Sequence, residues 1–240
     1  FTIAFFFTTF LDCIMKLREP MKLSDKTINL LKNFSDINQS ILFKKGNKLR
    51  TISVMKNIMA EAEVQEDFPK DFAIYDLTQF LRGVFLHNQP ELDFANDGHV
   101  VIREGKTRSK YFFADPSVIV VPPEKSLTLP TMDVEFELAA EQLEKIRKAV
   151  LAFQLPDLSV VGEAGVVKLV VHDKKNDTSN DFQVLVGETD GEFCFHFKVE
   201  NIKVIPGDYK VSISSKLLSK FINTDYDLTY YIALEPDSNF

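Results

Sequence analysis

The stretch FAIYDLTQFLRGVFLHNQPELDFANDGHVVI, residues 72–102, combines three local patterns in a fixed order. Phe72 and Ile74 alternate with other residues as in a short strand, and apolar residues from Leu77 to Val84 then recur at helical spacing. The Asn-Asp-Gly turn that follows separates two apolar runs, which is typical of a β-hairpin. The stretch therefore predicts a strand, a helix and a hairpin, in that order.

The same order recurs in residues 136–171, FELAAEQLEKIRKAVLAFQLPDLSVVGEAGVVKLVV. An alternating start at Phe136 is followed by a helical stripe of apolar residues from Leu143 to Phe153 and by a hairpin turn at Gly165. An internal repeat of this kind indicates a fold that is built from similar units.

Two weaker copies flank these. Residues 23–52 predict a helix whose N-cap is Ser24, followed by a hairpin around Gly46. The inward residues of that helix are expected to be Ile28, Leu31 and Phe34. Residues 193–213 predict an alternating strand, a short turn of helix around residues 200–204 and a further strand.

The four copies form two pairs, which are separated by ADPSVIVVPPEKSLTLPT at residues 114–131. The four prolines of this segment disfavour a helix or a central strand, so it is expected to be an extended connector. Residues 21–113 and 132–240 are then expected to form two similar domains. Each would place two helices on one face of an antiparallel sheet, which is an α+β architecture.

The composition limits the function. The net charge of −7 argues against a protein that binds nucleic acid with its whole surface, so any such contact requires basic residues gathered on one face. Two cysteines, Cys13 and Cys194, form no disulfide framework, which favours an intracellular setting. No apolar run reaches the roughly 18 residues of a membrane-spanning helix, and no membrane association is expected.

The first residues, 1–20, are rich in Phe and have no positive charge before their apolar run, which is unlike a signal peptide. We expect them to be an extension upstream of a true start at Met21, where MKLSDKT reads as a helix entry. A hydrophobic membrane anchor is the alternative.

The motifs that could carry chemistry are weak. Residues 93–104 fit a calcium loop only in part, because Ala95 occupies a ligand position and the flanks alternate as strands. Cys194 and His196 share one face of a strand but have no second pair of metal ligands, which favours ordinary packing. A hydrolase with paired carboxylates is left as a minor alternative. We expect no catalytic residues, no metal and no cofactor.

The helices offer a more informative pattern. When each apolar stripe is placed inward, Lys32, Arg82, Lys145 and Lys148 lie on the opposite faces, with Arg147 at the margin and Lys26 off to the side. Such residues are common on any solvated helix. The functional interpretation is contact with the phosphates of a nucleic acid, without regard to sequence.

Several segments together resemble one family. They are MKLS and LLKNF near Met21, AIYDLTQFL at 73–81, ADPS at 114–117, PGDYK at 206–210 and YIALEPDS at 231–238. In their order and spacing, they resemble the sliding clamps of T-even-type bacteriophages, which are DNA polymerase processivity factors. The resemblance extends from Met21 to the end of the chain and is weak between residues 172 and 190.

This resemblance implies the DNA clamp fold and a homotrimer that closes head to tail into a ring around double-stranded DNA. It implies three further partners or settings: the C-terminal peptide of the replicative polymerase, an ATP-dependent clamp loader, and the cytoplasm of an infected bacterial host. The residues expected to contact DNA are Lys32, Arg82, Lys145 and Lys148, with Lys26, Arg147 and Lys203 behind them. The residues expected to bind the peptide are Val118, Ile119, Val120, Val121, Ile232, Leu234 and Pro236.

Two other interpretations compete with the clamp at this stage. One is a non-catalytic, β-rich interaction or virion structural protein, which also uses pseudo-repeats. The other is an enzyme of unrecognised type.

Overall fold

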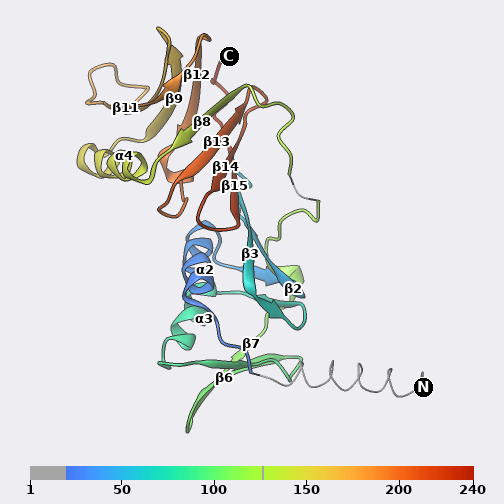
Figure 1. Ribbon diagram of the computed structural model, residues 1–240. Helices are drawn as coiled ribbons and strands as arrows, with labels where there is room; N and C mark the ends of the chain where they lie inside the picture. Colours follow the sequence, from blue (N-terminus) through green and yellow to red (C-terminus); the bar gives the residue numbers. More distant parts are fainter. Residues whose placement is uncertain (1–19, 126) are drawn as a thin grey trace. The chain divides into compact units, whose positions relative to one another are not determined.

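The computed structural model describes residues 20–125 and 127–240 (Figure 1), so all but the last residue of the predicted N-terminal extension lies outside it. The described chain divides into two compact units. Unit 1 contains the described residues up to Thr51 together with Glu63–Val121, and unit 2 contains Ile52–Ala62 and Pro122–Phe240.

Unit 1 places two helices beside short antiparallel strands. The three-stranded sheet has the order β5–β6–β7, and β1 pairs with β4. The elements of the chain up to residue 121 are α2 (Asp25–Ile37), β1 (Ile41–Phe43), β2 (Gly46–Ile52), β3 (Ile58–Phe68), β4 (Phe72–Ile74), α3 (Leu77–Val84), β5 (Glu91–Asp93), β6 (His99–Glu104), β7 (Thr107–Phe112) and the 3-10 turn η1 (Pro116–Val118).

The start of α2 is fixed from its own sequence and from a distant strand. The Ser24 side chain accepts a hydrogen bond from the Thr27 amide, as predicted for its N-cap. The buried Glu66 carboxylate, on β3, accepts hydrogen bonds from the Ser24 amide and from the Thr27 hydroxyl. A negative charge at this end also suits the helix dipole.

An aromatic cluster forms the core beside these helices. Phe43 stacks on Phe72 with ring centroids 4.5 Å apart, and Phe68, Phe94 and Phe113 pack around the pair. Phe43 also lies opposite Phe72 in the β1–β4 register. The predicted hairpin around Gly46 is therefore wrong: a turn occurs there, but β1 pairs with β4 because this places its aromatic side chain in the core.

Unit 2 has two antiparallel sheets and one long helix. The sheets have the orders β11–β10–β9–β12 and β2–β3–β15–β14–β13–β8, and α4 packs on β10 and β11. The elements are β8 (Val134–Leu138), α4 (Ala140–Phe153), β9 (Asp157–Glu163), β10 (Val166–His172), β11 (Phe182–Glu188), β12 (Phe193–Lys198), the 3-10 turn η2 (Val199–Asn201), β13 (Tyr209–Ser214), β14 (Leu218–Asn223) and β15 (Leu228–Ala233).

The predicted α+β class is confirmed, with two differences in detail. The second helical element of unit 2 is only the turn η2, because the β-branched residues after it and Pro206 disfavour a longer helix. Ile58–Ala62 of β3 pairs with β15, which places this segment in unit 2. The boundaries predicted for the two domains do not include such an exchange, and they remain predictions.

Candidate nucleic-acid interface

Helices α2 and α3 bury one face and expose cations on the other. On α2, Leu30, Leu31 and Phe34 are buried, whereas Lys32 is exposed. The Lys32 ammonium lies over the Phe85 ring, 4.8 Å from its centroid, and this contact holds a cation on an aromatic face. Arg82 is exposed on α3, whose sequence LTQFLRGV contains no acidic residue. Among the salt bridges of the described residues, neither of these cations takes part.

The outward face of α4 differs in its electrostatics. Leu143, Ile146 and Ala149 face the core, and the exposed side carries two lysines with two glutamates. Lys145 pairs with Glu141 at 2.7 Å, and Lys148 pairs with Glu144 at 2.6 Å, both at the i,i+4 spacing. The hydrogen bond from Lys145 lowers the pKa of Glu141. Each predicted DNA-contacting lysine of this helix therefore has a carboxylate beside it.

Arg147 has a different environment from the two lysines. It is half-buried and donates a hydrogen bond to the Val204 carbonyl. Burial lowers its pKa, while the nearby hydroxyl groups of Tyr209 and Tyr230 act in the opposite sense. The structure thus places Arg147 as a brace between α4 and the turn before β13. Lys26 and Lys203, which the sequence put behind the main candidates, are exposed.

Two tyrosines, Tyr209 and Tyr230, hold the same turn through hydrogen bonds to Ile205, the neighbour of Val204. The Tyr209 hydroxyl donates to the Ile205 carbonyl at 2.7 Å, and the Tyr230 hydroxyl accepts from the Ile205 amide at 3.1 Å. Burial raises the pKa of Tyr209 to about 12 and that of Tyr230 further still. Both therefore stay neutral and hold the turn at any ordinary pH.

The residues predicted to bind a peptide fall into two groups. Val118 and Val121 are exposed, and the Val120 carbonyl accepts a hydrogen bond from the Asn38 side chain at the end of α2. Ile119 and Val120 are half-exposed. In the second group, Pro236 is exposed and Leu234 is buried. Ile232 has no exposed surface because it lies inside the sheet on β15, so its side chain offers nothing to a partner in this conformation.

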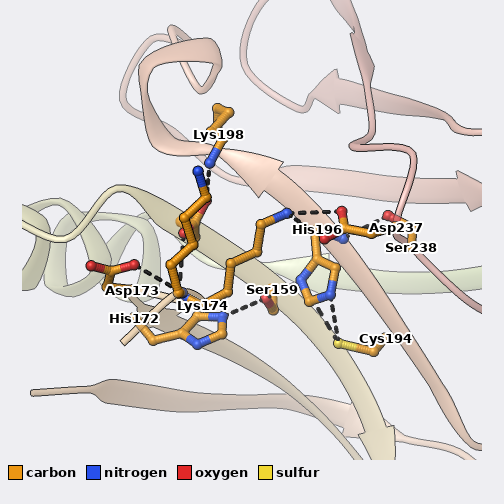
Figure 2. Close-up of polar contacts among 11 residues, drawn as sticks. Ser159, His172, Asp173, Lys174, Cys194, His196, Lys198, Asp237 and Ser238 are labelled. Atoms are coloured by element: carbon orange, nitrogen blue, oxygen red, sulfur yellow. Dashed lines mark hydrogen bonds and ion pairs between the residues drawn. The ribbon is translucent and has the colours of Figure 1, made fainter. Parts of the chain in front are cut away.

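Figure 2 shows the cluster that most resembles a catalytic arrangement. The Ser159 hydroxyl lies 2.7 Å from His172 Nε2 and 2.7 Å from His196 Nδ1, while Cys194 Sγ is 3.6 Å from His196 Nε2. Ser159 is buried, and its hydroxyl has one proton, so it can donate to one imidazole while it accepts from the other. Burial raises the pKa of the Cys194 thiol, which keeps it protonated. These contacts describe a packed polar network rather than an activated nucleophile.

The same network holds the end of the chain against β12. Lys174 pairs with Asp237 at 2.7 Å, and the His196 amide donates to the Ser238 hydroxyl (Figure 2). The Cys194 and Asn239 backbones exchange two hydrogen bonds. No group of three or more His, Cys, Asp or Glu side chains within 20–125 and 127–240 has the geometry of a metal site.

No helix in the described part of the chain is both long enough and apolar enough to span a bilayer.

Family models match both halves of the chain. The model described as DNA polymerase processivity factor matches residues 22–121, and the model described as gp45 sliding clamp, C terminal, matches residues 135–236. The chain belongs to the sliding clamp family. This confirms the predicted family and favours a processivity factor over a virion structural protein.

Whole-chain comparisons agree with the family models. The sliding clamp of Vibrio phage KVP40 is 36% identical over 222 residues, which cover 90% of this chain and 99% of that protein. The sliding clamps of Escherichia phage RB69 and Enterobacteria phage T4 are each 31% identical, over 91% of this chain and 98% of theirs.

Solved structures share the fold at lower identity. The A. fulgidus PCNA bound to the C-terminal region of FEN-1 superposes with a TM-score of 0.66 at 14% identity, covering 92% of this chain and all of that one. PCNA from Entamoeba histolytica gives 0.64 at 13% identity, with 87% and 94% coverage. At such identities the likeness establishes the clamp fold alone.

Sequence reasoning missed three residues that shape the candidate interface: Phe85, Glu141 and Glu144. The i,i+4 spacing of each glutamate before a lysine was available in the sequence as a signal for the ion pairs. Phe85 lies just beyond α3, and its contact with Lys32 of α2 requires the packing of two helices that are distant in sequence.

Proposed function

We propose that the chain is one subunit of a ring that encircles duplex DNA, tethers the replicative polymerase to it and does no chemistry of its own. One observation carries this proposal: α2, α3 and α4 each bury an apolar face and expose Lys32, Arg82, or Lys145 with Lys148 on the other. Long cationic side chains neutralise phosphates without reading bases, which suits movement along DNA of any sequence.

The edges of the sheets support assembly from several copies. β7 ends the three-stranded sheet of unit 1 and exposes Arg108 and Lys110, whereas β11 ends the four-stranded sheet of unit 2 and exposes Glu188. Phe112 on β7 and Leu185 on β11 are 69% and 61% exposed, which suits burial against another copy. Pairing of opposite charges from different edges gives a head-to-tail contact, and such contacts form a ring when the rotation between successive copies closes. The number three comes from the family resemblance.

The remaining partners rest on the family. We place the C-terminal peptide of the polymerase at Val118–Val121 of unit 1. Pro236 of unit 2 is a separate exposed candidate, whereas Ile232 and Leu234 are buried. The A. fulgidus PCNA, which shares the fold, is described as bound to the C-terminal region of FEN-1. An ATP-dependent clamp loader would open the ring, and the cytoplasm of an infected bacterium would be the setting.

The test reverses the charge at Lys32, Arg82, Lys145 and Lys148 together by substitution to Glu. We expect loss of processive synthesis because the helix faces would repel phosphate, while the mass in solution stays that of the assembled ring. A matched control reverses four exposed lysines away from these faces: Lys56, Lys175, Lys210 and Lys216. Unchanged processivity in the first variant, or equal loss in the control, would contradict the assigned surface.

A further inference from the structure

The candidate DNA-contacting cations of the two units differ in the groups that contact them within the protein. In unit 1, Lys32 lies on the Phe85 ring and Arg82 stands on a helix without acidic residues. In unit 2, Lys145 and Lys148 each hold a glutamate one turn earlier on α4. A phosphate that approaches α4 must therefore displace a carboxylate from each lysine, whereas Arg82 takes part in no salt bridge of the described residues.

The exposures show that this displacement is feasible. The side chains of Lys145 and Glu141 are 55% and 76% exposed, and those of Lys148 and Glu144 are 71% and 64% exposed. Exposed i,i+4 pairs are weak and exchange readily, so each lysine can turn from its glutamate to a phosphate. All four side chains lie on the side of α4 opposite Leu143 and Ile146, so the glutamates themselves face any DNA that the lysines meet.

We propose that Glu141 and Glu144 are affinity-setting residues, which compete with DNA phosphates for Lys145 and Lys148 and keep the DNA contact of unit 2 weaker than that of unit 1. This inference rests on the proposed function, because it assumes that these helix faces meet DNA. Weak contacts that exchange partners let a ring move along the duplex without being held at one phosphate, since topology and not affinity retains it.

The experiment measures the binding of the full-length protein to a short fluorescent DNA duplex by anisotropy at several salt concentrations. Glu141→Gln with Glu144→Gln should tighten binding by about fourfold, roughly twofold for each freed lysine. Binding should also depend more steeply on salt, by up to about 0.9 in the log–log slope for each additional phosphate contact. A control with the same change in net charge, Glu137→Gln with Glu192→Gln, alters exposed glutamates outside α4 and should change binding much less.

A thermodynamic cycle separates competition from general repulsion. In a Lys145→Gln, Lys148→Gln background, the glutamate substitutions should lose most of their effect, because no lysine remains to be freed. Equal tightening with and without the lysines, or no tightening by E141Q/E144Q, would overturn the inference. Failure of the proposed function gives a different result: Lys32→Gln with Arg82→Gln would leave binding unchanged.

Discussion

At the scale of single residues, neighbours on one helix have separate roles because their surroundings differ. Lys145 and Lys148 are exposed and ion-paired, whereas Arg147 between them is half-buried against the Val204 carbonyl. Helical periodicity places Arg147 only at the margin of the outward face, and the turn before β13 then covers it. Whether a cation near an outward helix face is available to DNA therefore depends on its burial and on the hydrogen bonds that it already makes within the protein.

Asp157 provides a pH-dependent prediction at this scale. It is buried at the start of β9 and pairs with Lys198, with 2.5 Å between Oδ1 and Nζ. Burial raises the pKa of Asp157, but the hydrogen bonds from Lys198 and from the Lys174 amide outweigh it and leave the pKa below its ordinary 3.8. We expect Asp157→Asn to lower the free energy of unfolding near neutral pH by about 2 kcal/mol, because Lys198 loses its partner while retaining some solvent.

The sign of the pH dependence follows from the two pKa shifts. A carboxyl with a depressed pKa stabilises the fold above its ordinary pKa, and this contribution is lost as the pH falls through the lower folded value. The pKa of Lys198 is raised from 10.5, so its contribution is lost as the pH rises beyond that value. The stability difference between wild type and D157N, measured by urea denaturation, should therefore shrink below pH 3.8. A difference that stays constant into acid would contradict the assigned pair.

At the scale of elements, helices and strands fix one another through a few polar contacts. β3 supplies the Glu66 carboxylate that caps α2, and the Asp76 side chain caps α3 by accepting from the Gln79 amide. The Tyr111 hydroxyl on β7 donates to the Asp76 carbonyl, which links that edge strand to the start of α3. The cation-bearing faces of unit 1 are therefore oriented by polar contacts made by other residues.

Glu66→Ala tests this dependence. We expect the free energy of unfolding to fall by about 2–3 kcal/mol, because the Ser24 amide and the Thr27 hydroxyl lose a buried, charged acceptor. Urea denaturation monitored by circular dichroism measures the change. Glu63→Ala is the matched control on the same strand, since its exposed pair with Lys48 contributes little. Equal losses in the two variants would show that Glu66 does not cap the helix.

At the scale of the whole molecule, an acidic chain can hold DNA if its charges are sorted by surface. The net charge is −7, yet the outward faces of α2, α3 and α4 carry cations and the edge strand β11 carries Glu188. On the proposed function, acidic residues elsewhere would keep DNA away from the other surfaces. The opposite charges on β7 and β11 also give the proposed self-association a direction.

A charge exchange between these edges tests that direction. Arg108→Glu with Lys110→Glu on β7 should weaken self-association by about tenfold or more, because the edge would repel the acidic β11 of the next copy. Adding Glu188→Lys with Asp190→Lys should restore most of the assembly. Sedimentation velocity over a range of protein concentrations measures both. An unchanged mass in the first variant, or no recovery in the second, would count against the paired edges.

The sequence by itself determined the order of strand, helix and hairpin in residues 72–102 and 136–171, the N-cap at Ser24 and the outward positions of Lys32, Arg82, Lys145 and Lys148. These features depend on periodicity and turn chemistry within a few residues, so they can be read locally. The family resemblance supplied the fold name and the expected function, and the comparisons confirmed both.

Only the tertiary structure shows which segments that are distant in the sequence pair or pack with one another. In the tertiary structure β1 pairs with β4, and Ile232 lies inside a sheet. Arg147 connects α4 to the Val204 carbonyl, and Glu66 lies at the start of α2. The physical reason is the same in each case: burial and hydrogen bonding at these positions are set by residues far away in the chain, whose approach no local pattern encodes.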